Sequence, residues 1–162
     1  MKENKLIIRI ADIKDSAILY NLDLELEKYE SKFAIIRNNP KRKETFKIFR
    51  NRFRKDLKKR GFRFFIAEYK GNPVGFTVAQ IEKNPVFPKY TKRGHIGPTF
   101  IKKEYRNKNI GSKLLKEALN WFKSKKIKLV QVSIIAKNNN ALKFWRKKGF
   151  KDYSMRMNLI LK

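Results

Sequence analysis

The stretch KKEYRNKNIGSKLLKEALNWF, residues 102–122, decides the fold, because a basic polar turn passes there directly into an amphipathic helical pattern. We expect the helix over 110–125. The first four N–H groups of a helix lack internal partners and point outward at the positive end of its dipole. Gly111 removes a Cβ that would hinder an anion, and Asn109 tolerates left-handed backbone better than most residues. One glycine in a basic turn is nevertheless compatible with two structures, a phosphate cradle and an ordinary loop.

Length and composition predict one domain over residues 1–162, since domains commonly run to about 100–150 residues. Hydrophobic residues make up 41% of the chain, enough for one core, and 13 are phenylalanine. No run approaches the roughly 20 apolar residues that span a bilayer. The chain has no cysteine, so we expect no disulfide and no thiolate metal site. The opening residues do not resemble a secretory signal, and we expect a cytoplasmic protein without membrane contact.

The charge is strongly unbalanced, with 42 Lys and Arg against 14 acids and a formal net charge of +28. Such a charge attracts nucleic acid, anionic lipid or phosphorylated ligands, and it repels cationic substrates. A genome biased toward lysine codons, or thermophilic enrichment in charge, explains the same numbers. Both explanations stay open at this stage.

The first half of the chain predicts a strand, two helices and a hairpin. Residues 6–10 form the strand, and residues 11–30 the first helix, with Asp12 as N-cap and Asp15 as the capping-box acid. The second helix covers 41–60, and its opposite face is basic. Strands at 62–69 and 74–81 flank a Gly71-Asn72 turn. One apolar stripe of the second helix predicts core packing; it comprises Phe46, Phe49, Phe53 and Leu57.

The second half predicts a strand at 93–102, the helix at 110–125, and a β-branched strand at 127–135. A short helix at 138–149 closes at Gly149, a residue suited to the position after a helix end. Alternation over 150–161 predicts a final strand. The elements together make one α/β domain with a mixed sheet.

Two motifs resemble those of the Gcn5-related N-acetyltransferase (GNAT) superfamily. The family's acetyl-CoA loop reads Arg-x-x-Gly-x-Gly/Ala; here Arg106 and Gly111 match, and Asn109 replaces the first glycine. The later motif reads Asn-x-x-Ala-x-x-x-Tyr-x-x-x-Gly-Phe, with Trp145 in place of the tyrosine. The positions that match it are Asn138, Ala141, Gly149 and Phe150. The order of elements also fits, so the resemblance covers nearly the whole chain.

The resemblance implies a GNAT fold: a mixed, mostly antiparallel central sheet flanked by helices, with strands 4 and 5 splayed apart. It also implies transfer of the acetyl group of acetyl-CoA to a primary amine of a small molecule or protein, by direct attack in a ternary complex. Ile101 and Ile134 would flank the gap between the splayed strands. The implied cofactor-binding residues are Phe100, Ile101, Lys102, Arg106, Asn107, Lys108, Asn109, Ile110, Gly111, Ser112, Asn138 and Trp145.

His95, the one histidine of the chain, is the candidate general base, since its ordinary pKa lies near 6.5. It falls where the similar arylalkylamine N-acetyltransferases carry one of two strand histidines, and Gly97 takes the place of the second. A lone strand histidine is also often structural. Glu82, acting through water, is the alternative base. The competing interpretation is that Glu82 is an ordinary solvated residue at the end of a strand.

The general acid is less defined. An indole N–H has negligible acidity, so Trp145 cannot protonate the departing thiolate and serves for packing or cofactor contact. Tyr153 or Tyr105, solvent, or departure of the bare thiolate would replace the family's tyrosine.

The candidate contacts of the acceptor amine are Tyr29, Glu30, Phe87 and Tyr90. We expect the protein to be a monomer or a homodimer. An alternative function is a nucleic-acid- or ribosome-associated binding protein on a GNAT scaffold, with CoA binding but weak or no catalysis. The basic residues of 41–60 and of 125–128 favour it.

Overall fold

The structure, a computed structural model, describes residues 6–33, 45–86 and 89–159. Its centre is one five-stranded sheet in the order β1-β2-β3-β4-β5. Neighbouring strands are antiparallel except β4 and β5, which are parallel. The strands are β1 (Leu6–Ile10), β2 (Phe62–Tyr69), β3 (Asn72–Lys83), β4 (Lys92–Ile101) and β5 (Val130–Val132).

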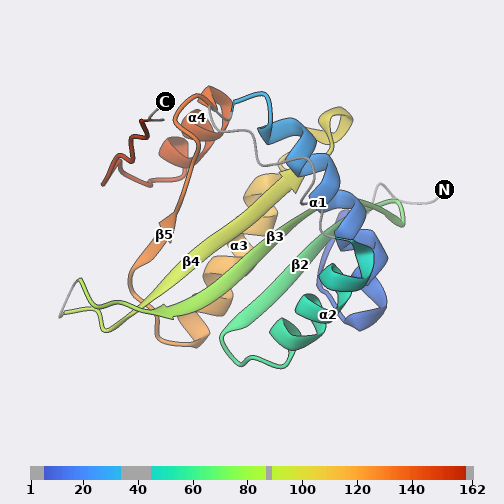
Figure 1. The fold of residues 1–162 in the computed structure, drawn as a ribbon, viewed down its shortest axis with the longest axis horizontal. Helices are drawn as coiled ribbons and strands as arrows, with labels where there is room; N and C mark the ends of the chain where they lie inside the picture. The colour runs from blue at the N-terminus through green and yellow to red at the C-terminus, as the bar shows by residue number, and fades with distance from the viewer. Residues whose placement is uncertain (1–5, 34–44, 87–88, 160–162) are drawn as a thin grey trace.

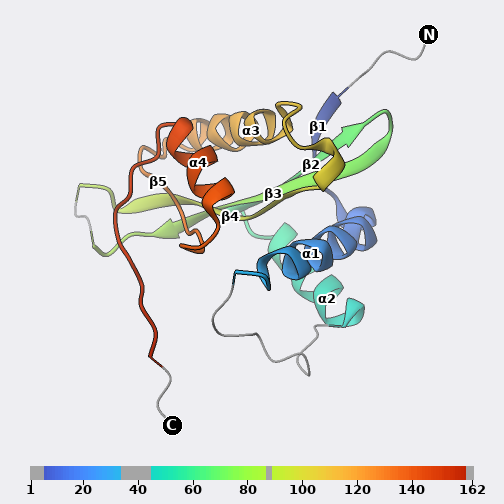
Figure 2. The same ribbon diagram turned by 90° about the horizontal axis from the view of Figure 1, so that it is seen from above.

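Helices cover both faces of the sheet (Figures 1 and 2). On one face lie α1 (Ser16–Glu30) and α2 (Phe46–Leu57); on the other lie α3 (Ile110–Ser124) and α4 (Asn139–Lys147). The predicted fold class, a mixed and mostly antiparallel sheet flanked by helices, is confirmed.

The entry to α1 follows the predicted capping pattern. The Asp12 side chain accepts from the Lys14 N–H at 2.7 Å, while the Asp12 N–H donates to Asp15 at 2.8 Å. A 3₁₀ turn, Ile13–Asp15, precedes α1, so the α-helix itself begins later than expected. Helix α2 also begins later, after Thr45, whose side chain caps it; residues 41–44 of the expected helix lie outside the described residues.

The β2–β3 hairpin forms as predicted, but its turn is one residue earlier. Lys70 (φ 52°) and Gly71 (φ 81°) are the central residues, and Tyr69 pairs with Asn72. A two-residue turn with positive φ at both positions matches the twist of the flanking strands. The expected Gly71-Asn72 turn is therefore wrong, and β3 starts at Asn72.

The expected final strand is also wrong in its described part, since residues 150–159 form no strand and all of them after Phe150 are exposed. Met155, Met157 and Leu159 keep the alternation that suggested one, yet each is at least 80% exposed. Alternation shows that a segment fits a half-buried sheet surface, and it does not supply an edge to pair with. The strand expected over 127–135 shrinks to three residues, so β5 offers little such edge.

Two clusters of apolar side chains fill the space on either side of the sheet. Leu114, Ala118 and Phe122 of α3 pack on one face, and the predicted α2 stripe packs on the other through Phe49 and Phe53. Phe46 is partly exposed instead of fully buried. The described helices include none with the length and apolar character needed to cross a membrane.

Strand β4 carries a bulge that matters for the site. Thr99 pairs with Thr77 and Ile96 with Ala79, so β4 has one extra residue between these two pairs. Before the bulge, Ile96 belongs to the α3-side core; after it, Phe100 belongs to the α1-side core. The strand therefore changes which of its side chains face the two helical layers.

Candidate active site

The loop between β4 and α3 has the backbone geometry of an anion cradle. Asn107 (φ 62°) and Asn109 (φ 60°, ψ 11°) are both left-handed, as expected for Asn109. Left-handed residues alternating with right-handed or extended ones turn successive N–H groups toward one side. Lys113 donates to the Asn109 carbonyl at 3.2 Å, so the amides of residues 110–112 precede the first bond of the helix. A group of N–H donors without intrahelical partners thus lies at the positive end of α3.

The Arg106 side chain is held in place by contacts within the protein. Its Nε donates to the Ile101 carbonyl at 3.0 Å, and its Cζ lies 4.4 Å from the centroid of the Tyr29 ring. The guanidinium thus holds the loop against the end of β4 and against α1. Lys102 is also engaged, with Nζ 3.7 Å from a Glu25 carboxylate oxygen. Lys103 and Lys108 remain exposed beside the loop.

Gly111 is required by packing rather than by the approach of an anion. A Cβ at this position would lie 3.1 Å from Ile101 Cδ1 and 3.3 Å from the Phe144 ring. The missing side chain lets the head of α3 press against β4 and α4. Phe144 was missed in the sequence, although its place beside Trp145 in the second motif was a usable signal.

The gap between β4 and β5 opens next to this loop. Pairing covers Gly94–Ile96 with Val130–Val132 and goes no further, and Figure 1 shows β5 diverging from β4 toward α4. Lys102 donates to the Val74 carbonyl at 2.9 Å, so its N–H faces β3. By alternation the backbone groups of Ile101 face the gap.

The second motif builds α4 as predicted but uses its aromatic for packing. The Asn138 side chain accepts from the Ala141 N–H at 3.2 Å, which caps the helix. Gly149 follows the helix with φ 89°. Trp145 is 6% exposed and makes edge contacts with Phe144 and Phe150, so its side chain belongs to the core. Ile134 packs against the same core.

A polar strip crosses the sheet on the face that α1 and α2 occupy. Arg93 donates to Glu82 Oε2 at 3.0 and 3.1 Å and to Gln131 at 2.8 Å, which links β3, β4 and β5. His95 is half-buried in this strip and pairs with Gln80 on one side and Gln131 on the other. Sequence reasoning identified His95 and Glu82, and it missed Arg93 and the two glutamines.

The environment of His95 favours its neutral form. Burial lowers the pKa of the imidazole below its usual 6.5; the Arg93 charge acts in the same direction, and the Glu82 charge opposes both. Glu82 is tied to Arg93, which makes it the weaker candidate base. Gly97, two residues on, carries no side chain on the same face as His95.

The remaining candidates are more scattered. Glu30 at the end of α1 has a raised pKa because of burial and the nearby Glu27 charge. Tyr90 is half-buried, and Phe87 lies outside the described residues. Tyr153 is 68% exposed on the segment after α4, whereas Tyr105 lies in the cradle loop with its ring centroid 5.7 Å from that of Tyr69.

Comparison with known proteins agrees with this geometry. The model of the acetyltransferase (GNAT) family matches residues 23–150. An uncharacterized N-acetyltransferase of Methanocaldococcus jannaschii is 27% identical over 95 residues, 55% of this chain and 39% of that protein. An N-alpha-acetyltransferase of Sulfurisphaera tokodaii is 29% identical over 105 residues, 62% of this chain and 63% of that protein. The chain thus spans less than two thirds of the length of both curated relatives.

The fold is shared with a crystal structure of a predicted acetyltransferase from Clostridium acetobutylicum, solved with acetyl-CoA. The TM-score is 0.74 at 18% identity, and the match covers 96% of each chain. The family match extends over most of the sequence and includes both the cradle loop and α4. This chain therefore belongs to the acetyltransferase (GNAT) family.

Proposed function

We propose that this chain is an N-acetyltransferase that transfers the acetyl group of acetyl-CoA to a primary amine of a small molecule or protein. The observation that carries the proposal is the left-handed Asn109 at the head of α3, in the loop that follows the part of β4 no longer paired with β5. Family membership and the relatives named as N-acetyltransferases support it. The transfer would proceed by direct attack in a ternary complex.

The cofactor would lie along the cradle and the gap. Its pyrophosphate would accept from the amides of residues 107–112, with Lys108 beside them, since the Arg106 N–H, expected to join them, donates to the Lys103 carbonyl at 3.2 Å. Its pantetheine arm would follow the backbone of residues 100–102, where the Ile101 peptide faces the gap. Asn138 would border the arm through α4. Trp145 would support α4 from the core and would not touch the cofactor.

His95 would act as the general base. The acceptor ammonium must lose a proton before its nitrogen attacks the thioester carbonyl, and a neutral imidazole takes that proton. A C–N bond forms, the C–S bond breaks and CoA leaves as a thiolate. Tyr153 is exposed and Trp145 is buried, so we assign protonation of the thiolate to solvent, with Tyr105 as the nearest hydroxyl of the loop.

The deciding experiment is calorimetric titration of acetyl-CoA into wild type and a Ser112→Glu variant. The new carboxylate would occupy the first turn of α3, where negative charge suits the helix dipole but repels pyrophosphate. We expect at least tenfold weaker binding with an unchanged unfolding temperature. Asn120→Glu, which makes the same charge change farther along α3, should bind like wild type. Equal binding by all three proteins would reject the cradle.

The proposal extends to the domain organisation, the oligomeric state and the location of the protein. The whole chain, residues 1–162, would form one acetyltransferase domain that acts as a monomer or homodimer. It would act in the cytoplasm, a location supported by the absence of cysteine. The protein would also associate with nucleic acid, independently of acetyl transfer, through the end of the sheet opposite the cradle.

A further inference from the structure

The end of the sheet opposite the cradle brings together basic segments that are far apart in the sequence. Ile81 donates to Gly61 at 2.8 Å, and Gly94 donates to Leu129 at 2.8 Å, so the loops before β2 and β5 meet the β3–β4 hairpin. Helices α2 and α3 also end here. We call the exposed cations of this region the basic end: Lys58, Lys59, Arg60, Lys83, Lys92, Lys123, Lys125, Lys126 and Lys128.

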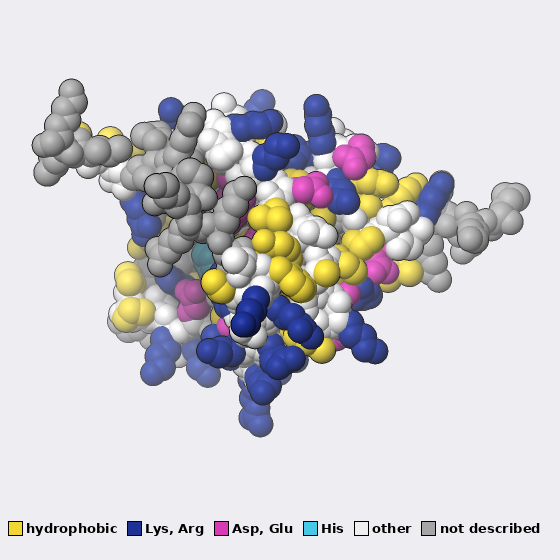
Figure 3. Space-filling model, turned by 45° about the vertical axis from the view of Figure 1, so that its right-hand side comes forward, with side chains coloured by type: hydrophobic (Ala, Val, Ile, Leu, Met, Phe, Trp, Pro, Cys, Tyr) yellow, Lys and Arg dark blue, Asp and Glu magenta, His cyan; other side chains and the backbone are white. Residues whose placement is uncertain are grey.

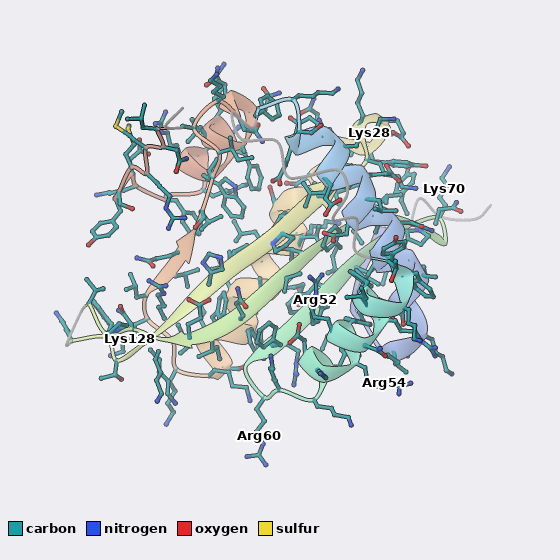
Figure 4. The ribbon with its side chains drawn as sticks, viewed as in Figure 1. Lys28, Arg52, Arg54, Arg60, Lys70 and Lys128 are labelled. Carbon is teal, nitrogen blue, oxygen red and sulfur yellow. The ribbon has the colours of Figure 1, made fainter. Side chains whose placement is uncertain are left out.

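The figures show the same gathering. Lys and Arg side chains crowd the lower end of the molecule in Figure 3. In Figure 4, Arg60 and Lys128 project from the lower part of the sheet, while Lys28 and Lys70 lie on the opposite side. The basic end is therefore one gathering of cations, although exposed Lys and Arg also lie elsewhere, for example on α4.

Local neutralisation does not account for this charge. Segments 56–63, 80–83, 91–94 and 121–130 contain eleven Lys and Arg but two acids, Asp56 and Glu82, each already paired. The C-terminal ends of α2 and α3 contribute about half a negative charge each, which offsets about one cation. Lys83 stands directly opposite Lys92, an unfavourable pairing in a free sheet.

A hollow in the basic end has an unfilled hydrogen-bond donor. It measures about 380 Å³ and is lined by Lys83, Asn84, Pro85, Thr91 and Lys92. Asn84 is 5% exposed, and neither its Nδ2 nor its Oδ1 has a hydrogen-bond partner in the structure as described. A buried amide without partners is costly, and its Nδ2 would donate to an anionic oxygen held between two lysines once the side chain turned toward the hollow.

We infer that the basic end binds the phosphate backbone of nucleic acid, independently of base sequence. Strand β4 separates it from the cradle by roughly 30 Å, at about 3.3 Å per residue, so CoA does not account for it. A membrane-surface helix needs an apolar face turned outward, and α2 buries Phe49 and Phe53 in the core. A flexible polyanion with phosphates spaced along it suits cations spread over several elements.

The test is fluorescence anisotropy with short labelled duplexes of DNA and of RNA over a range of salt. One variant carries Lys58→Gln, Arg60→Gln, Lys83→Gln and Lys125→Gln; the matched control carries Lys28→Gln, Lys32→Gln, Lys116→Gln and Lys143→Gln. Both lose four charges, and all eight side chains are exposed. The first variant should bind at least tenfold more weakly, with a salt slope shallower by about 3.6, because each of the four lost contacts removes about 0.9 from it.

The control should bind nearly as wild type does, and both variants should keep wild-type affinity for acetyl-CoA. Asn84→Leu should weaken duplex binding without lowering the unfolding temperature. Equal losses in the two quadruple variants would mean that net charge alone attracts the duplex, and would overturn the inference. Preference for phosphatidylglycerol vesicles over both duplexes would overturn it in favour of a membrane.

Discussion

At the residue scale, Asn109 shows how the loop between β4 and α3 forms without the first glycine of the family's motif. Left-handed backbone costs an ordinary L-residue roughly 1–2 kcal/mol, and asparagine tolerates it better. Its φ of 60° matches the conformation that a glycine would adopt without strain. The loop therefore keeps its shape although the motif is changed.

We expect Asn109→Gly to unfold at nearly the same urea concentration as wild type, whereas Asn109→Val should lose about 1–2 kcal/mol. The β-branched side chain disfavours positive φ, and the new glycine does not. Urea unfolding measures both, and acetyl-CoA titration should follow the same order. Identical losses in the two variants would show that the Asn109 side chain matters and its backbone does not.

The charges around His95 predict the direction in which the pH profile of kcat/KM should shift. If the neutral imidazole is the base, kcat/KM should rise with pH through the His95 pKa, which burial places below 6.5. Arg93→Gln removes a nearby cation and should move this limb to higher pH. Glu82→Gln removes an anion and should move it to lower pH. If the pH profile of kcat/KM shifts in neither variant, or is unchanged in His95→Ala, His95 is not the general base.

At the scale of elements, the start of α1 depends on a buried carboxylate. Arg9 donates to both oxygens of Asp15 at 2.7 Å, and a third bond comes from the Asp12 N–H. The Arg9 hydrogen bonds hold the Asp15 pKa below its usual 3.8. Arg9 also reaches Glu68, so this cluster ties β1, α1 and β2 together.

We expect Asp15→Asn to lose about 3 kcal/mol, the typical cost of removing one partner of a buried ion pair. Because the folded pKa is depressed, the contribution of Asp15 is complete above pH 3.8 and fades as pH falls through the folded pKa. Urea unfolding at neutral pH and near pH 3 should therefore show a smaller difference between wild type and variant at the lower pH. Lys14→Gln, on the same turn, is the control and should cost little.

Local elements were predictable from the sequence because their signals are local. The Asp12 cap, the hairpin and the Gly149 helix end each depend on residues within a few positions. The final strand was not predictable, since it needs an edge that β5 does not provide. The contacts of Gly111 with Phe144, and of Arg93 with Gln131, join distant segments and leave no local pattern.

At the scale of the whole molecule, the charge of +28 acts against the compact state through self-repulsion. Salt screens such repulsion, with a Debye length of about 10 Å at 0.1 M. The unfolding temperature should therefore rise as sodium chloride increases from about 0.02 to about 0.3 M. Differential scanning calorimetry measures it, and the quadruple Gln variant of the basic end should show a smaller rise. A fall with salt would mean that ion pairs such as that of Arg9 dominate.

Because of the extra residue in β4, odd-numbered and even-numbered side chains exchange faces of the sheet partway along the strand. Before it, odd positions such as His95 lie on the face covered by α1 and α2; after it, even positions such as Phe100 do. Deleting one residue at Pro98 would remove the bulge and restore regular alternation, so Ile96 and His95 would keep their present faces but stand one position nearer the cradle. In a relative without this insertion, a polar strip on this face would lie at positions of the opposite parity counted from the cradle, and an ungapped alignment of β4 would pair a polar-strip residue with a core residue.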